Sequence, residues 1–139
     1  MRRATVPKAY DLRAALRGKS EITSETTYDQ FKEACPTLTR FDRGKVSLGR
    51  FASQTPWEIH QEGDEFLYVL DGKIDVVLLN GTRPVRIPVK AGSIFLVPKG
   101  VWHRQVPRPV ASVLSALPTA HGPVSWEEDP RRKARPSRA

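Results

Sequence analysis

Two short segments carry the residues best suited to chemistry, and each sets a histidine beside an apolar strand. The first contains His60 and, five positions later, Glu65. The second ends in His103, directly after a Pro-Lys-Gly turn. Imidazole nitrogens and carboxylate oxygens are common ligands of borderline divalent metal ions. Because the chain has only three histidines and two stand in these segments, we expect the chemistry of the protein here.

The two segments resemble the two sequence motifs of the cupin superfamily, whose members are small β-barrels that often hold one metal ion. The second motif fits closely, since Gly92 is followed by five residues and then by Pro98-x-Gly100-x-x-His103. In the first motif, six residues lead from the glutamate to a glycine, as they do here from Glu65. The resemblance covers roughly residues 45–117 and implies a fold more firmly than a reaction.

The resemblance also implies a ligand set. In the cupin arrangement, His60, Glu65 and His103 would point at one central spot and bind a divalent ion such as Fe, Mn, Zn or Ni. Cupins often carry His-x-His before the glutamate, and here the second histidine position reads as Glu62. Glu62 would then supply a fourth ligand, and an added carboxylate favours harder ions such as Mn or Fe(II).

Two alternatives to this ligand set stay open. A β-bulge would exchange Asp64 for Glu65 as the inward carboxylate. The barrel could also keep its fold without a metal, with His60 and His103 only hydrogen-bonded. The third histidine, His121, lies beyond the last predicted strand, and we interpret it as a surface residue.

Four further residues are predicted to bind substrate. Trp57 and Trp102 stand within three residues of a motif histidine, so they either wall a pocket or pack at the barrel mouth. Gln105 follows His103 by two positions and would point inward with it. Arg50 could clamp a carboxylate through its planar guanidinium, although exposed arginines are more common.

The elements that must position these residues read as short strands. Their close spacing predicts an all-β fold, an antiparallel cupin or jelly-roll barrel with short N-terminal helices. A helix capped by Ser24 is expected over residues 25–34, and Asp71-Gly72 predicts a two-residue hairpin turn. We divide the chain into an N-terminal segment (1–44), the barrel (45–118) and a C-terminal extension (119–139) with a basic tail expected to be disordered.

The net charge of +8 does not favour nucleic-acid binding. Six basic residues fall in the first nineteen positions and five in residues 130–139, whereas residues 20–126 hold twelve Lys and Arg against eleven Asp and Glu. No helix-turn-helix pattern or zinc-finger spacing accompanies the charge. The basic ends therefore predict solvated segments outside the site.

Composition limits the remaining function classes. No apolar run approaches the ~20 residues of a membrane span, and the single Cys35 fits a cytoplasmic location and an incidental rather than nucleophilic thiol. The resemblance suggests a homodimer and two functions. One is a metal-dependent small-molecule enzyme of the dioxygenase, isomerase or lyase type. The other is a non-catalytic cupin that binds a small molecule as a sensor, without a metal.

Overall fold

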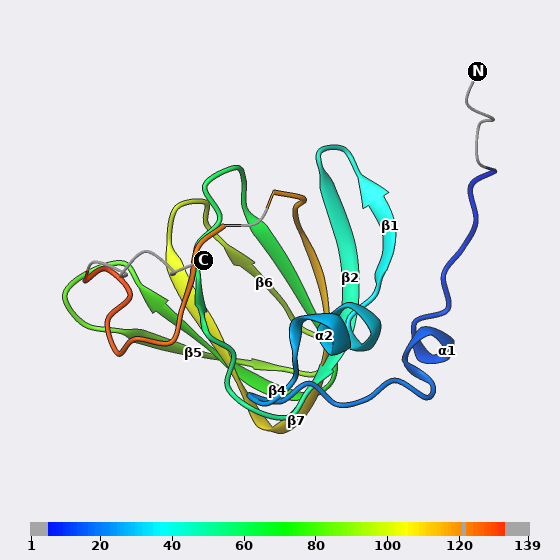
Figure 1. Ribbon diagram of the computed structural model, residues 1–139, viewed down its shortest axis with the longest axis horizontal. Helices are drawn as coiled ribbons and strands as arrows, with labels where there is room; N and C mark the ends of the chain where they lie inside the picture. The colour runs from blue at the N-terminus through cyan, green and yellow to red at the C-terminus, as the bar shows by residue number, and fades with distance from the viewer. Residues whose placement is uncertain (1–5, 121, 133–139) are drawn as a thin grey trace.

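Eight strands and two short helices make up the part of the chain that the computed structural model describes, residues 6–120 and 122–132 (Figure 1). The helices come first, α1 at Leu12–Leu16 and α2 at Tyr28–Ala34. The strands are β1 Thr37–Phe41, β2 Gly44–Phe51, β3 Trp57–Glu58, β4 Glu65–Leu79, β5 Val85–Lys90, β6 Ile94–Val97, β7 Trp102–Pro118 and β8 Val124–Ser125.

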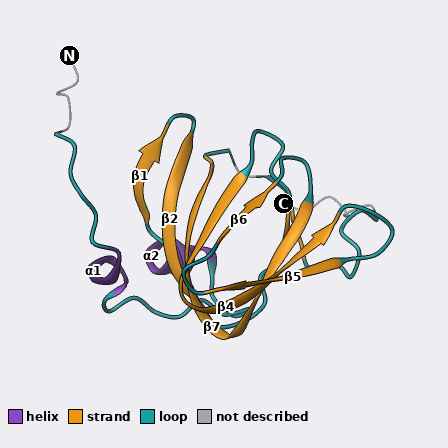
Figure 2. Ribbon diagram, turned by 180° about the vertical axis from the view of Figure 1, so that it is seen from behind, coloured by secondary structure: helices purple, strands orange, loops and turns teal. Residues whose placement is uncertain are grey.

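The strands form one strongly curled antiparallel sheet (Figure 2). The two longest strands, β4 and β7, pair along most of their length, and β2 pairs with the second half of β7. β5 and β6 pair with successive parts of β4, while β3 lies between β7 and β8. This arrangement confirms the predicted antiparallel barrel with short N-terminal helices.

Alternation along the strands divides the sheet into an inner and an outer face. The inner face is filled by a core that includes Leu67, Val69, Val76 and Val113, each at most 1 % exposed. The outer face of β4 and β7 carries a second, smaller cluster built around Trp57. Which face a residue occupies therefore decides whether it can reach the interior of the barrel.

The hairpin predicted at Asp71-Gly72 is wrong, because β4 runs through it without a turn. The pairing of β4 with β7 shifts register on both sides of this dipeptide, so the irregularity is a bulge and not a reversal of the chain. Gly72 has φ +75°, and a Cβ there would lie 2.1 Å from the carbonyl oxygen of Val110. The glycine is thus required by close backbone approach across two paired strands.

The N-terminal segment closes one side of the barrel. The α2 helix is capped by Thr27 in a capping box with Gln30, so it begins three residues later than a Ser24 cap would place it. Ala34 at its end is buried, whereas Phe31 is exposed. No helix in the described ranges is long and apolar enough to cross a membrane.

The C-terminal extension is partly docked on the barrel. β8 pairs with β3, Pro130 is buried, and the Arg131 guanidinium donates a hydrogen bond to the carbonyl of Gly81. The first residues of the tail that was predicted to be disordered, Pro130 and Arg131, therefore contact the barrel. Residues 133–139 and His121, for which we also made predictions, lie outside the described residues.

Candidate metal centre

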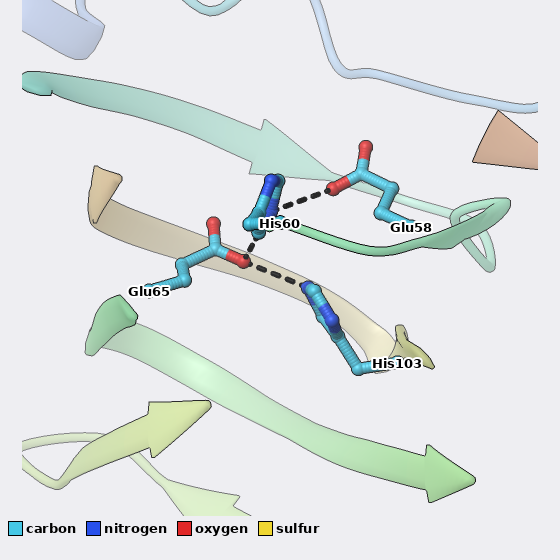
Figure 3. A group of neighbouring side chains, drawn as sticks. All are labelled: Glu58, His60, Glu65 and His103. Atoms are coloured by element: carbon cyan, nitrogen blue, oxygen red, sulfur yellow. Dashed lines mark hydrogen bonds and ion pairs between the residues drawn. The ribbon is translucent and has the colours of Figure 1, made fainter. Parts of the chain in front are cut away.

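Four side chains, from strands β3, β4 and β7 and from the loop after β3, converge inside the barrel: Glu58, His60, Glu65 and His103 (Figure 3). Each offers one ligand atom, and these atoms all lie within 4.8 Å of one another. Ligands about 2.1 Å from a shared ion are at most about 4.2 Å apart, twice the bond length. The donor set of two imidazoles and two carboxylates thus fits a divalent metal ion after small side-chain movements.

Glu65 is the buried centre of the cluster. It opens β4 opposite Val97, shares the inner face with Leu67, and is 3 % exposed. Burial alone would raise the pKa of this carboxyl, but the hydrogen bond with His103 and the contact with His60 lower it to about 2. The side chain is therefore a carboxylate at neutral pH, held in a dehydrated place.

His103 is held by a hydrogen bond at each ring nitrogen. Its Nδ1 lies 3.0 Å from the carbonyl oxygen of Val101, and its Nε2 lies 2.9 Å from Oε1 of Glu65. Burial would lower the pKa of the imidazole, but the bond to Glu65 outweighs it and the pKa is raised. Because both partners are acceptors, the ring donates at both ends as an imidazolium, and the Nε2 proton stands where a cation would bind.

His60 is positioned by its backbone and not by its ring. Its carbonyl accepts a hydrogen bond from the Gly100 amide at 2.8 Å. A Cβ on Gly122 would meet the carbonyl oxygen of Ile59 at 1.9 Å, so the C-terminal segment presses on the same stretch. The ring Nε2 is 3.3 Å from Glu65 Oε1 and 3.7 Å from Glu58 Oε2.

The ring nitrogens of His60 nevertheless lack a hydrogen bond. The side chain is only 9 % exposed, yet neither nitrogen finds an aligned partner among the described residues. A buried polar group without a partner is uncommon in a folded protein and signals a missing ligand or water. This orphaned imidazole is the observation that most directly calls for a ligand at the centre of the cluster.

Glu58 completes the cluster from β3, where it pairs with His103. Its side chain is 35 % exposed, so it stands on the open side of the group. Burial of the carboxyl, and then the negative charge of Glu65, raise the pKa of Glu58. The charges of His103 and His60 act in the opposite direction and lower it. Two carboxylates this close repel each other unless a cation or a proton lies between them.

The structure brings together three of the sequence-predicted ligands, but the fourth carboxylate is Glu58 and not Glu62. Glu62 is exposed, and Asp64 is also exposed and accepts a hydrogen bond from the Lys99 amide. The available signal was the spacing Glu58-x-His60, since two residues apart on a strand lie on one face. The glutamate therefore occupies the first position of the His-x-His pair, and His60 occupies the second.

The residues predicted to bind substrate separate onto the two faces. Trp57 and Trp102 belong to the outer cluster, where the Arg104 guanidinium lies 4.3 Å from the Trp57 ring centroid. Arg50 alternates with the inward Phe51 and donates to Ser112 Oγ at 3.4 Å, so it too faces outward. Only Gln105 shares the inner face with His103, as alternation along β7 requires.

Gln105 and Cys35 are the remaining polar side chains of interest inside the barrel. The Gln105 Oε1 atom is buried without a hydrogen-bond partner within the described ranges. Cys35 packs over Gly49, and burial raises the pKa of its thiol to about 12. A thiol that stays protonated is a poor nucleophile, so the cysteine contributes packing and not chemistry.

Comparison with known proteins bears on the whole arrangement. The cupin domain family matches residues 48–106. Among solved structures, a protein from Neisseria meningitidis is 17 % identical with a TM-score of 0.62, covering 81 % of this chain and all of that one. A cupin superfamily protein from Desulfitobacterium hafniense is 18 % identical with a TM-score of 0.59, covering 85 % and 98 %.

An enzyme is also among the structural neighbours. Hydroxypropylphosphonic acid epoxidase from S. wedmorenis, solved with fosfomycin, is 18 % identical with a TM-score of 0.53, and the likeness covers 60 % of this chain and 49 % of that one. No curated protein matches the chain. At these identities the likenesses show the fold, and together with the family match they show a cupin fold in which residues 48–106 match the cupin domain.

Proposed function

We propose that this protein is a metal-dependent enzyme acting on a small molecule, with Glu58, His60, Glu65 and His103 as the metal ligands. The observation that carries the proposal is the convergence of four donor atoms around a buried imidazole without a hydrogen-bond partner. Nitrogen and oxygen donors in equal number suit Fe(II), Mn(II), Ni(II) or Zn(II), and the second carboxylate favours the harder Fe(II) and Mn(II).

Each ligand has a defined part in this proposal. The Val101 carbonyl fixes His103 with Nδ1 protonated, which directs the Nε2 lone pair into the cluster once its proton leaves. Glu65 supplies a buried negative charge, and the Gly100 amide holds the His60 backbone in place. Glu58 lines the exposed side, where a substrate would enter.

The set of ligand atoms is compatible with several classes of reaction. A bound divalent ion with open positions would polarise a carbonyl or enolate, or bind dioxygen, which suits an isomerase, a lyase or a dioxygenase. The protein would exclude bulk water from three of the four ligands, since His60, Glu65 and His103 are buried. The enzymatic neighbour named above supports such a use of the fold but does not supply the substrate.

The experiment that tests the proposal is metal analysis of protein purified without a histidine tag. We expect close to one Fe, Mn, Zn or Ni ion per chain after reconstitution, and loss of that ion in His60→Ala and His103→Ala. Glu58→Gln should bind the ion about tenfold more weakly, because an amide oxygen is a weaker ligand than a carboxylate. Oxygen uptake by the iron-loaded protein with candidate substrates then separates a dioxygenase from an isomerase or lyase.

A second candidate function is a metal-free cupin that binds or senses a small molecule. It is favoured by the hydrogen bond between His103 and Glu65, which satisfies both side chains without a metal. In that case Fe, Mn, Zn and Ni would all fail to bind at micromolar protein concentration, and His103→Ala would lower the thermal stability without changing any metal content.

We further propose a homodimer, in a cytoplasmic setting that keeps Cys35 reduced. The outer face bears apolar residues in register on adjacent strands, with Ile94 beside Tyr68 and Leu96 beside Phe66. Ile94 and Leu96 are 63 % and 53 % exposed. An exposed apolar patch can pair with a second copy of itself about a twofold axis. Sedimentation of the wild type should give a dimer and that of Leu96→Asp a monomer.

A further inference from the structure

β3 carries Glu58 and leads into His60, yet few bonds join it to the long strands of the barrel. Within the described residues, β3 pairs with β7 at a single position, Glu58 opposite His103. Thr55, before the strand, makes two hydrogen bonds with β7, and the His60 carbonyl, after it, accepts one from the Gly100 amide. The two ends of this stretch are therefore fixed, whereas the part between them depends on what lies along its other edge.

The other edge of β3 is covered by segment 122–125, near the C-terminus. β8 pairs with β3 at two positions, Trp57 with Ser125 and Glu58 with Val124. Directly after β3, the Ile59 amide donates a hydrogen bond to the Pro123 carbonyl at 3.3 Å, and Gly122 lies against Ile59 and His60. Each residue of β3 and the two residues after it thus have a neighbour in this segment, in a continuous antiparallel alignment.

The contact at Gly122 is too close for any side chain. A Cβ there would lie 1.9 Å from the carbonyl oxygen of Ile59 and 3.7 Å from Cα of His60. Because the obstacle is backbone and not a flexible side chain, a larger residue must push the two segments apart. The glycine therefore sets the separation between segment 122–125 and the chain that carries His60.

Segment 122–125 has anchors of its own on either side. Before it, the amide and the hydroxyl of Thr119 donate hydrogen bonds to the Arg43 carbonyl at 3.2 and 2.8 Å. After it, the Arg131 guanidinium donates to the Gly81 carbonyl. These anchors lie on the turn between β1 and β2 and on the loop after β4, so the segment is tied to the barrel independently of β3.

The four proposed ligands therefore fall into two pairs that are held in different ways. Glu65 and His103 stand on β4 and β7, which pair with each other along most of their length. Glu58 and His60 stand on the stretch whose outer edge is held by segment 122–125. The first pair is fixed by the body of the barrel, and the second by an element from near the end of the chain.

We propose that segment 122–125 positions two of the four metal ligands, because its backbone holds the chain that presents Glu58 and His60 to the other two. The inference rests on the proposed function, since it assumes a metal at the cluster. Neither Gly122 nor β8 contributes a ligand atom to the cluster. Both act through the backbone against which they pack, so they are positioning residues.

Cobalt titration tests the inference without turnover. Co(II) binds to sites of mixed nitrogen and oxygen ligands, and its visible d–d bands report the number and arrangement of those ligands. Metal-free full-length protein is titrated with Co(II), as wild type and as Gly122→Ala. We expect the variant to bind Co(II) about 10–100-fold more weakly, the usual cost of disturbing the support of a ligand. Its bands should also change, because Glu58 and His60 are displaced.

Two control variants separate positioning from general stability. Gly81→Ala makes the same chemical change where a Cβ has no neighbour within 4 Å, so it should leave the Co(II) affinity and the bands unaltered. Val89→Ala opens a cavity in the inner core on β5, which should lower the melting temperature but not the affinity. Circular dichroism of each variant establishes that the fold persists.

Hydrogen exchange of the wild type keeps the inference testable should Gly122→Ala not fold. Coupling between two sites is reciprocal, so a segment that favours metal binding must be held more tightly once the metal is bound. Saturating Zn(II) should slow amide exchange in residues 122–126 about tenfold. Exchange in residues 85–90 of β5, away from the cluster, should not change.

The outcomes separate this inference from the function on which it rests. Wild-type affinity and bands in Gly122→Ala overturn the positioning role while the metal site stands, and so does an equal loss of affinity in Val89→Ala. Exchange in residues 122–126 that Zn(II) leaves unchanged overturns it as well. If the wild type binds neither Co(II) nor Zn(II), the proposed function fails and the inference falls with it. Weaker binding and altered bands in Gly122→Ala alone support both.

Discussion

Two buried carboxylates on β4 face opposite sides of the same sheet, and each is flanked by two nitrogen-bearing side chains. On the inner face, Glu65 lies between His60 and His103, at 3.3 and 2.9 Å. On the outer face, Asp75 lies 3.1 Å from the Arg86 guanidinium and 2.9 Å from Nε of Arg108. The two arrangements look alike as contacts and differ in what they leave unsatisfied.

The difference lies in the chemistry of the partners. Arginine is always charged, so Asp75 is permanently neutralised, and its partners keep about half of their side-chain surface in water, 46 % for Arg86 and 49 % for Arg108. Histidine gains or loses its charge near neutral pH and can exchange a proton for a metal. The outer group is therefore a closed ion pair, whereas the inner group has room for a cation.

The largest expected effect comes from removing the inner carboxylate. Glu65→Gln should weaken metal binding by at least about a hundredfold, because it deletes a direct ligand and even outer-shell changes cost 10–100-fold. Asp75→Asn is the matched control, since it makes the same change on the other face of β4 and should leave metal content unaltered. Metal stoichiometry by mass spectrometry decides between them, and equal losses in both variants would contradict the comparison.

Metal addition should stabilise the protein through the inner group alone. At a free metal concentration 100 times the Kd, binding adds about 2.7 kcal/mol to the free energy of unfolding. Thermal unfolding should therefore shift upward in the wild type and in Asp75→Asn, and should return to the starting value with a chelator. A comparable shift in Glu65→Gln would mean that the metal binds elsewhere.

Removing the outer carboxylate should cost stability in a pH-dependent way. Hydrogen bonds from Arg108, and then from Arg86, lower the pKa of Asp75 in the folded protein despite its burial. A lowered folded pKa gives stability above the unfolded value, near 4, that is lost as pH falls through the folded value. Asp75→Asn should thus lower the free energy of unfolding by about 1–2 kcal/mol at pH 7.

The difference in free energy of unfolding between wild type and Asp75→Asn should shrink below pH 4, as the Asp75 carboxyl of the wild type becomes protonated. Urea unfolding of wild type and variant at pH 7 and at pH 3 measures it. A gap that stays constant across this range would show that the aspartate acts through packing and not through its charge.

The smallest expected effect belongs to Glu62. This side chain is exposed and lies outside the cluster, so Glu62→Gln should change neither metal affinity nor the melting temperature measurably. Its counterpart is Glu58→Gln, which should weaken metal binding. If metal titrations ranked these two variants the other way, the fourth ligand would be the one that the sequence motif suggested.

The fold was largely predictable because its signals are local and repeated. Short β-forming runs and the glycine turn before His103 are enough to indicate an antiparallel barrel. The continuity of β4 was not predictable, because Asp-Gly favours a tight turn in isolation and only the nearby Val110 backbone makes Gly72 a bulge. Close approach between two backbone segments that are distant in sequence cannot be recognised from the residues that flank the glycine.

The candidate site was predictable in part. His60, Glu65 and His103 follow from family spacing. Glu58 was missed although it stands two residues before His60, and its pairing with His103 across β3 and β7 is visible only in the folded chain. The outward direction of Arg50 was likewise hidden, since both Leu48 and Gly49 beside it are buried. Where both faces of a strand are covered, burial no longer shows which side faces the cavity.

The pairing of β2 with β7 has a consequence for when the proposed metal site would form in a new chain. It joins Gly44 to Pro118, and the bond between Glu65 and His103 spans 38 positions. Contacts so distant along the chain form late, after the entropy of closing long loops has been overcome. Three of the four donors lie within residues 58–65, but the fourth, His103, joins them only when the barrel closes, so a half-synthesised chain carries an incomplete set. Under the proposed function, selection among ions would depend on the finished geometry and on the metals available to the folded protein.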